Sequence, residues 1–361
     1  MNSLLRLLLK SQHQRNRSGP AQTEKGMTLV ELLVGSIMAF LIITPMLAFV
    51  VDMLNTDRRE QVKSNTEQDI QAAVDFIAQD LSQAIHIYDN NPTTGIPELI
   101  TRNFIPAGAD RIPILVFWKR QIIRNAIPVD NSVTEPGGCP LDPLAGQPRQ
   151  CNDSYVLSLV AYYQIKDNLS MWCQPSGSSC PTRIVRYQIQ SGLENTKNLT
   201  TGKLYTTFRD DQKRHPAYNA GDPATNKPPF DITKPEQNVT AGTSQFDVPR
   251  PPVLVNYIDH SPKPLLNNEC TIALGNPTVT SGVGGSTPID EDTLKVTDST
   301  SSTPTNSFYA CVDTARNIAR VTIRGNSLRR IQNDYADYDA KKAAYFPTAS
   351  VQVEGLGARG R

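Results

Sequence analysis

The chain has 361 residues and a nearly balanced charge, with 36 Lys and Arg against 35 Asp and Glu. Its formal net charge of +1 argues against a nucleic-acid-binding domain, which usually carries a strongly basic stripe. Only 7% of the residues are aromatic and 27 are proline, which is typical of a loop-rich β domain more than of a compact enzyme core. The length allows one or two globular units.

The first 26 residues form a basic leader in which Glu24 is the single acidic side chain. Its cations are Arg6, Lys10, Arg15, Arg17 and Lys25. The apolar piece Leu4–Leu9 contains Arg6 and is too short to cross a bilayer, which needs about 20 apolar residues. Because basic flanks stay on the cytoplasmic side of a membrane, we expect everything after the first span to lie outside the cytoplasm.

The segment 27–51 is apolar apart from one charged residue, Glu31. At about 1.5 Å of rise per residue, a helix of this length crosses a hydrocarbon core of about 30 Å. A carboxylate deep in such a helix costs roughly 2.5–3.5 kcal/mol when it has no partner, so the presence of Glu31 requires an explanation. Pro45 lies within the segment and should kink the helix or melt it locally.

The residues 25–31, Lys-Gly-Met-Thr-Leu-Val-Glu, stand at the start of this segment. A basic leader that ends in Gly, followed by a hydrophobic residue and then Thr-Leu-x-Glu, resembles the processing site of type IV prepilins and pseudopilins. The resemblance implies that a prepilin peptidase cleaves between Gly26 and Met27 and that the new amine of Met27 is methylated. It also implies that Glu31 pairs with the amine of a neighbouring subunit during assembly. The alternative is a signal anchor that happens to contain a glutamate.

After Val51 the sequence becomes amphipathic. Apolar residues recur at steps of three and four positions, at Ile70, Val74, Ile77, Leu81, Ile85 and Tyr88. This spacing predicts one apolar face on a helix, which another layer must cover. The segment 89–92, Asp-Asn-Asn-Pro, should end the helix. We therefore expect one helix from Met27 to about Tyr88, some sixty residues and roughly 90 Å long.

Beyond Pro92, short runs rich in β-branched and aromatic residues predict strands. They are Ile112–Ile123, Tyr155–Ile165, Arg183–Gln190, Lys203–Phe208, Pro252–Ile258, Ile318–Arg324 and Ser350–Glu354. A helical period of comparable length does not separate them, so we expect an antiparallel sheet that packs on the apolar face of the helix. The segments 210–250 and 275–306 are rich in Pro, Asn, Gly, Ser and Thr and are expected to be long loops.

All six cysteines follow the apolar segment, at Cys139, Cys151, Cys173, Cys180, Cys270 and Cys311. An even number on the translocated side predicts disulfides formed in an oxidising compartment. Six cysteines permit fifteen connectivities, so the pairing stays open. Pairing of nearest neighbours would join Cys139–Cys151, Cys173–Cys180 and Cys270–Cys311, and the short Cys173–Cys180 loop is the best favoured because its Pro and Gly support a turn. The sequence has no Cys-x-x-Cys spacing, so we do not expect zinc.

The sequence offers little catalytic chemistry, and we expect neither an enzyme nor a bound cofactor or metal. After processing, the histidines are His86, His215 and His260, and the sequence contains no nucleophile elbow, metalloprotease or phosphate-loop motif. The acidic runs 290–292 and 210–211 raise the question of calcium, since this ion prefers oxygen ligands. Their spacing matches no EF-hand, and a solvated charge run is the better interpretation.

The segments 165–186 and 316–330 resemble the heads of larger minor pseudopilins. The whole chain looks most like the cyanobacterial pseudopilins linked to hormogonium polysaccharide secretion and gliding. The resemblance implies a pilin-like α+β lollipop fold with four parts: a prepilin leader (1–26), a transmembrane or filament-core helix (27–51), an amphipathic stem helix (52–89) and an extracytoplasmic β-rich head (90–361).

The function that the resemblance implies is that of a minor pseudopilin of a type IV pilus or type II secretion-like machine, supporting polysaccharide secretion and gliding motility. Its partners would be the prepilin peptidase, other pilins or pseudopilins through the N-terminal helix, the membrane and the exported polysaccharide. It would be a single-pass protein of the bacterial inner membrane, with a cytoplasmic N-terminus and a periplasmic or extracellular head. Alternatives are a minor pilin of a true type IV pilus and a signal-anchored extracytoplasmic enzyme that acts on glycans.

Overall fold

The computed structural model describes residues 28–129, 133–141, 150–166, 171–177, 179–194, 196–219, 230–232, 234–242, 246, 251–281, 285–298 and 304–357. The chain divides into two compact units, residues 1–58 and 59–361. The boundary falls inside the longest helix, α2 (Leu29–Leu81), so its 53 residues contribute to both units. The predicted leader, 1–26, lies outside the described residues.

The part of α2 in the first unit is an apolar helix that is unbroken at Pro45, so the proline does not melt it. Every residue from Thr28 to Gln61 is exposed, and the exposed fractions of Leu29 and Phe40 are 86% and 71%. By length and composition this helix can cross a membrane, in agreement with the predicted single span. An apolar surface of this length needs lipid or other protein to cover it.

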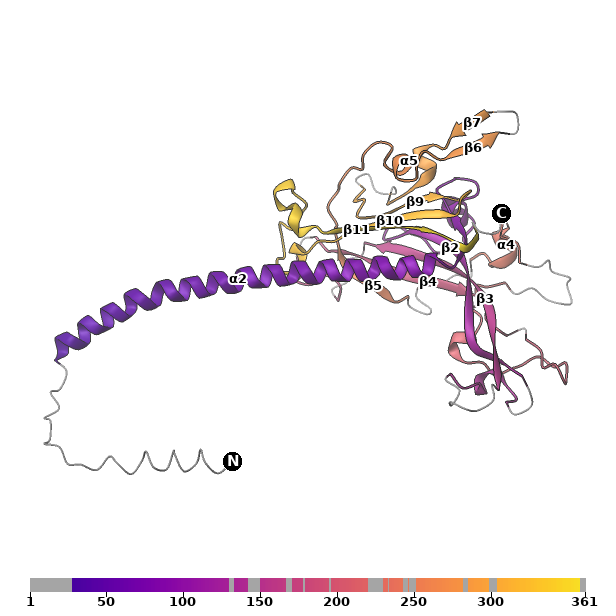
Figure 1. Ribbon diagram of the computed structural model, residues 1–361, viewed down its shortest axis with the longest axis horizontal. Helices are drawn as coiled ribbons and strands as arrows, with labels where there is room; N and C mark the ends of the chain where they lie inside the picture. The colour runs from indigo at the N-terminus through magenta and orange to yellow at the C-terminus, as the bar shows by residue number, and fades with distance from the viewer. Residues whose placement is uncertain are drawn as a thin grey trace, which may run out of the picture. The chain divides into compact units, whose positions relative to one another are not determined.

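The described part of the second unit contains two large antiparallel sheets and a two-stranded hairpin (Figure 1). The larger has five strands in the order β1-β2-β3-β4-β5, and the smaller has four in the order β11-β10-β9-β8. The strands of the larger sheet are β1 (Ala84–Tyr88), β2 (Arg111–Pro128), β3 (Cys151–Ile165), β4 (Thr182–Gln190) and β5 (Val253–Ile258). Those of the smaller are β8 (Lys295–Val296), β9 (Phe308–Asp313), β10 (Ile318–Arg324) and β11 (Thr348–Glu354). A long N-terminal helix followed by antiparallel sheets confirms the predicted α+β class.

Four short α-helices, one hairpin and several 3-10 turns accompany these sheets in the described part of the unit. The helices are α3 (Ile96–Thr101), α4 (Pro235–Asn238), α5 (Glu269–Ala273) and α6 (Glu291–Leu294). The hairpin pairs β6 (Thr278–Ser281) with β7 (Gly285–Pro288). Both β6 and β7 fall in the segment 275–306, so the prediction of a continuous loop there is wrong for these residues. Alternating Thr and Val in β6 carry the period of two that a short strand needs.

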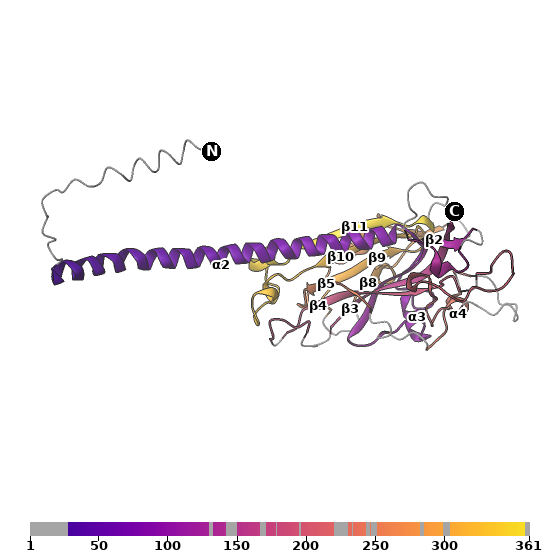
Figure 2. The same ribbon diagram turned by 90° about the horizontal axis from the view of Figure 1, so that it is seen from below.

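The second half of α2 contributes the apolar face that its sequence predicts. Ile70, Val74, Ile77 and Leu81 are at most 1% exposed and join one core with residues of both large sheets. The helix comes very close to the turn after β10, because a Cβ added to Gly325 would lie 2.3 Å from Cδ1 of Ile70. β11 lies alongside this half of α2 in two perpendicular views (Figures 1 and 2).

The end of the helix differs from the prediction. α2 stops at Leu81, and the residues Ala84–Tyr88 form the edge strand β1 rather than a further helical turn. β1 pairs with β2, with His86 opposite Trp118 and Tyr88 opposite Val116. The apolar residues of this segment fit a period of two as well as a helical one, and pairing with a long neighbouring strand decides for the strand.

The remaining strand predictions are largely confirmed, with one error and two omissions, β8 and β9. Lys203–Phe208 is not a strand, and it contributes an isolated bridge between Leu204 and Lys197. β9, which the sequence prediction missed, pairs with both β10 and β8 in the smaller sheet. Parts of the predicted loop 210–250 lie outside the described residues, and its described part includes α4.

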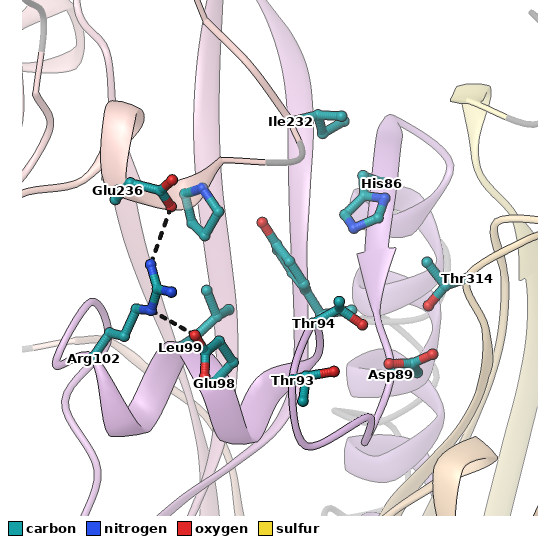
Figure 3. Close-up of a pocket in the computed structure, with 12 residues that line it drawn as sticks. His86, Asp89, Thr93, Thr94, Glu98, Leu99, Arg102, Ile232, Glu236 and Thr314 are labelled. Atoms are coloured by element: carbon teal, nitrogen blue, oxygen red, sulfur yellow. Dashed lines mark hydrogen bonds and ion pairs between the residues drawn. The ribbon is translucent and has the colours of Figure 1, made fainter.

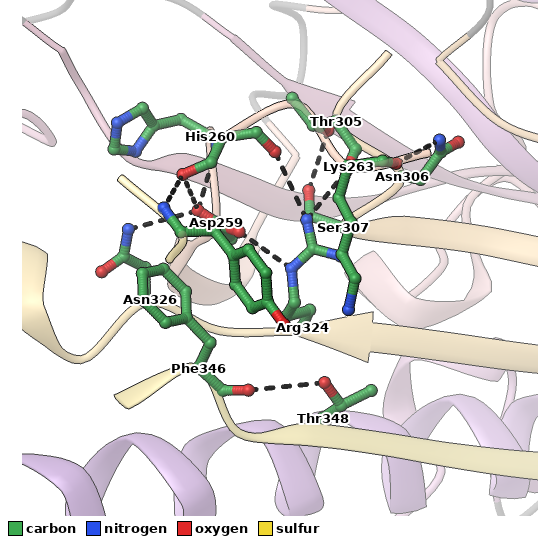
Figure 4. Close-up of polar contacts among 12 residues, drawn as sticks. Asp259, His260, Lys263, Thr305, Asn306, Ser307, Arg324, Asn326, Phe346 and Thr348 are labelled. Atoms are coloured by element: carbon green, nitrogen blue, oxygen red, sulfur yellow. Dashed lines mark hydrogen bonds and ion pairs between the residues drawn. The ribbon is translucent and has the colours of Figure 1, made fainter. Parts of the chain in front are cut away.

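A buried ion pair joins the two sheets at one corner (Figure 4). Nε of Arg324, the last residue of β10, donates to Oδ2 of Asp259 at 2.8 Å, directly after the end of β5. Asn326 donates to the other carboxylate oxygen of Asp259 at 3.2 Å. Both ionic side chains are at most 5% exposed. A buried ion pair is stable only when its charged groups have hydrogen-bond partners, as they do here. These contacts therefore hold the end of β5 against the end of β10.

The six cysteines form three disulfides, Cys139–Cys151, Cys173–Cys180 and Cys270–Cys311. This confirms nearest-neighbour pairing and the short Cys173–Cys180 loop. Cys151 begins β3, so the first bridge holds the chain at the far end of the long β2–β3 ribbon. The third bridge joins α5 to β9, across 41 residues of sequence.

Candidate functional site

The N-terminus of α2 is the first candidate site, and the structure describes it from Thr28 onward. Glu31 lies in the first turn. Its Oε2 accepts from the backbone N and from Oγ1 of Thr28, both at 3.2 Å, and its own backbone N donates to Oγ1 of Thr28 at 3.3 Å. This reciprocal arrangement is a capping box. The predicted processing residues, Gly26 and Met27, lie outside the described residues.

The capping box gives Glu31 a local role that the sequence analysis missed, although Thr-x-x-Glu at the start of a helix is its signature. It satisfies donors that the first helical turn leaves without partners. In the described part of the chain, Oε1 of Glu31 has no partner, and no Lys, Arg or His forms an ion pair with this carboxylate. Glu31 can therefore cap its own helix with one oxygen and accept from another molecule with the other.

A buried charge cluster at the other end of α2 is the second feature. Asp80 accepts from Nζ of Lys119 and from Nε of Arg186, both at 2.6 Å, and from the hydroxyl of Tyr162 at 2.7 Å. Burial alone would raise the pKa of the Asp80 carboxyl, but Arg186 and Lys119 hold it below its usual value. The partners come from β2, β3 and β4, so the cluster attaches the last turn of α2 to the middle of the larger sheet.

A cavity of about 280 Å³ lies between the end of β1, α3 and α4 (Figure 3). Tyr88, Asp89, Glu98, Arg102 and Glu236 are among the residues that line it. Arg102 forms ion pairs with Glu98 at 2.5 Å and with Glu236 at 3.5 Å. No local sequence pattern indicates this cavity, because its walls come from segments more than a hundred residues apart.

Asp89 has a different environment from the two glutamates. Its Oδ1 accepts from the backbone N of Asn91 at 3.0 Å, and among the described residues no cation forms an ion pair with it. Burial raises the pKa of the Asp89 carboxyl, and the nearby charge of Asp313 adds to this effect. His86 and Thr314 line the same side of the cavity as Asp89 in Figure 3.

The acidic run 290–292 has a structural role. Glu291 accepts from the backbone N of Cys270 at 2.9 Å and of Thr271 at 2.8 Å, in the first turn of α5. Burial would raise the pKa of Glu291, but these amides hold it below its usual value. In the residues that the structure describes, no group of three His, Cys, Asp or Glu side chains is placed to hold a metal ion.

The histidines of the head are not brought together. His86 lies on β1, His215 contacts the ring of Tyr187, and Nε2 of His260 lies 3.1 Å from Asp337. Burial lowers the pKa of His215.

Comparison of the chain with protein family models, curated proteins and solved structures finds no match.

Proposed function

We propose that this protein is a minor pseudopilin, stored in the bacterial inner membrane and assembled into a short filament of a type IV pilus or type II secretion-like machine. A prepilin peptidase would cleave it between Gly26 and Met27, and the filament would support polysaccharide secretion and gliding. The observation that carries the proposal is the exposed apolar half of α2 with its lone carboxylate, Glu31, one turn from the predicted new N-terminus.

The proposed mechanism starts with the subunit in lipid. Lipid covers the apolar residues of α2 before assembly, and the same residues of neighbouring subunits cover them in the filament. The free oxygen of Glu31 accepts from the methylated amine of a neighbour, while the other oxygen keeps the capping box with Thr28. Pairing removes two uncompensated charges from an apolar setting and sets the register between subunits.

The capping box allows a sharp test of this role. Glu31→Gln keeps a side chain that can cap the helix but loses the charge, whereas Thr28→Val breaks the cap and keeps the charge. In the bacterium that makes the protein, we expect the Gln variant to be inserted and processed but absent from sheared surface filaments. We expect the Val variant at position 28 to enter filaments.

Intact-mass measurement supplies the control for processing. The mature wild-type chain and both variants should begin at Met27 and carry one added methyl group, while Gly26→Leu should keep the full leader. Filaments that contain Glu31→Gln protein at the wild-type level would refute the charge-pairing role. Normal cleavage of Gly26→Leu would refute processing by a prepilin peptidase and favour the signal-anchored alternative.

A further inference from the structure

The cavity between β1, α3 and α4 is large enough for a small ligand. Its volume of about 280 Å³ approaches the lower end of ordinary ligand pockets, about 300 Å³. In Figure 3, Arg102 with Glu98 and Glu236 stands on one side and Asp89 on the other, with Thr93 and Thr94 between them. The lining therefore mixes hydroxyl groups with charged groups.

The charges of the lining do not balance. Among the described residues that line the cavity, Asp89, Glu98 and Glu236 are carboxylates, Arg102 is the one guanidinium or ammonium group, and His86 adds an imidazole. Arg102 is already engaged by both glutamates. Asp89 is left partly buried without a cation, which is an unfavourable state for a carboxylate. A ligand that brings a positive charge would remove this imbalance.

The cavity also contains a buried hydrogen-bond donor. Tyr88 is 3% exposed, and its oxygen accepts from Nε1 of Trp118 at 3.0 Å. The hydroxyl proton of Tyr88 has no acceptor among the described residues. Burial raises the pKa of this phenol well above its usual range, so the proton stays in place as a donor. A suitable ligand thus carries an oxygen acceptor as well as a cation.

We propose that this cavity binds a compact hydroxylated molecule that carries a free ammonium group, the chemistry of an amino sugar. The ammonium group donates to Asp89, and a ring or hydroxyl oxygen accepts from Tyr88. The hydroxyl of Thr94 offers a further partner, and Oγ1 of Thr93, which donates to Oδ1 of Asn91 at 2.9 Å, can still accept from the ligand. This binding site is independent of the proposed assembly role, because its residues all belong to the second unit.

Titration of the full-length chain in detergent micelles with three sugars tests the proposal. D-glucosamine has the ammonium group, D-glucose replaces it with a hydroxyl, and N-acetyl-D-glucosamine keeps the nitrogen without the charge. We expect calorimetry to show binding of D-glucosamine at least about tenfold tighter than that of the other two, the difference that one charge-assisted hydrogen bond provides. Equal binding of the three sugars, or no binding of D-glucosamine at millimolar concentration, would overturn the proposal.

Two variants locate the site, and a third controls for charge. Asp89→Asn and Tyr88→Phe should each weaken D-glucosamine binding, by about tenfold or more for the loss of the charge. Glu354→Gln, an exposed change at the end of β11, should leave binding as in the wild type. Asp89→Asn protein that melts like the wild type and binds D-glucosamine equally well would refute the site.

A fourth ligand distinguishes the carrier of the ammonium group. Nα-acetyl-lysine amide presents the same cation on an aliphatic chain, as a protein side chain would. Weaker binding of this compound than of D-glucosamine supports the hydroxylated carrier. Tighter binding would refute it and assign the cavity to a lysine side chain of a partner protein.

Discussion

The two ends of α2 each carry a carboxylate in an apolar setting, and the two carboxylates differ in burial and in hydrogen-bond partners. Glu31 is exposed, lies in the first turn and receives hydrogen bonds from Thr28 alone among the described residues. Asp80 is buried, lies in the last two turns and receives hydrogen bonds from Lys119, Arg186 and Tyr162. The first is open to a partner, and the second is saturated within the chain.

The helix dipole explains why the two carboxylates need different support. A negative charge is favoured near the N-terminus of a helix, so Glu31 is tolerated with little further help. The same charge near the C-terminus is disfavoured, and Asp80 is buried as well. Two cations and a hydroxyl offset both costs. The difference indicates that Asp80 serves folding within one chain, whereas Glu31 is available for contacts between chains.

The largest loss of folding stability should come from removing Asp80, the carboxylate with three hydrogen-bond donors. Asp80→Ala leaves Lys119, whose side chain is 5% exposed, without an anion in the core. Loss of one partner from a buried ion pair costs about 3–5 kcal/mol, so we expect the free energy of unfolding of the head to fall by that amount. Chemical denaturation monitored by Trp fluorescence measures the loss.

Asp75→Ala is the matched control on the same helix. Asp75 is exposed and accepts from Gln71 at 3.0 Å, so its loss should cost less than about 0.5 kcal/mol. Equal effects of the two substitutions would mean that the Asp80 cluster does not attach the helix to the sheet.

A smaller effect should come from the close contact between α2 and the turn after β10. In Gly325→Ala the new Cβ would lie 2.3 Å from Cδ1 of Ile70 and 2.9 Å from Cγ2 of Thr66. Overpacking of this kind costs about 1–3 kcal/mol. Ile70→Val removes the clashing Cδ1, so the double variant should be more stable in denaturation than Gly325→Ala alone. If it is not, Thr66 rather than Cδ1 of Ile70 limits the space for the new Cβ.

Loss of the capping box at the N-terminus of α2 should have a smaller effect on stability. Thr28→Val removes the acceptor for the backbone N of Glu31, and loss of such a cap costs about 1 kcal/mol. We expect amide hydrogen exchange in the first turn of α2 to speed up about fivefold in micelles, with the melting temperature of the head unchanged. A change in head stability would show that the two ends of the helix are not independent.

The smallest expected effect is on the pH dependence of folding stability. The pKa of Asp80 is lower in the folded protein than its usual value of 3.8, so the unfolded chain binds this proton more readily. Its contribution to stability is therefore complete above about pH 4 and is lost as the pH falls through the lowered folded value. In denaturation at pH 6 and at pH 3, the free energy of unfolding should fall less between the two pH values for Asp80→Ala than for the wild type. An identical loss would assign the acid sensitivity to other carboxyl groups.

Features set by neighbours in sequence were predictable, and features set by distant residues were not. The face Ile70–Leu81 follows from helical spacing, and the short Cys173–Cys180 disulfide follows from a loop whose Pro and Gly favour a turn, whereas the pairing of the other cysteines stayed open. The partners of Asp80 come from positions 39, 82 and 106 residues away, so only the folded sheet identifies them. The cavity around Asp89 was missed for the same reason.

The edge strand β1 shows how local reasoning fails in detail. Ala84–Tyr88 continues the apolar spacing of the helix before it, and the sequence contains no strong helix stop until Pro92. Pairing with β2 supplies backbone hydrogen bonds that a solvated last turn would lack. Lys203–Phe208 shows the opposite error. It has the composition of a strand, but in the described residues it pairs only through the isolated bridge between Leu204 and Lys197.

The position of β11 determines when the head can close during synthesis. The ribosome makes α2 before all four strands of the smaller sheet and β11 after the other three, yet β11 lies alongside α2 and pairs with β10 over its whole length. Ala349, Val351 and Val353 pack against the core from this strand. A nascent chain that stops before Thr348 therefore has an uncovered core and an open sheet edge, and such edges invite aggregation. Completion of the head must wait for the 7 residues of the last strand.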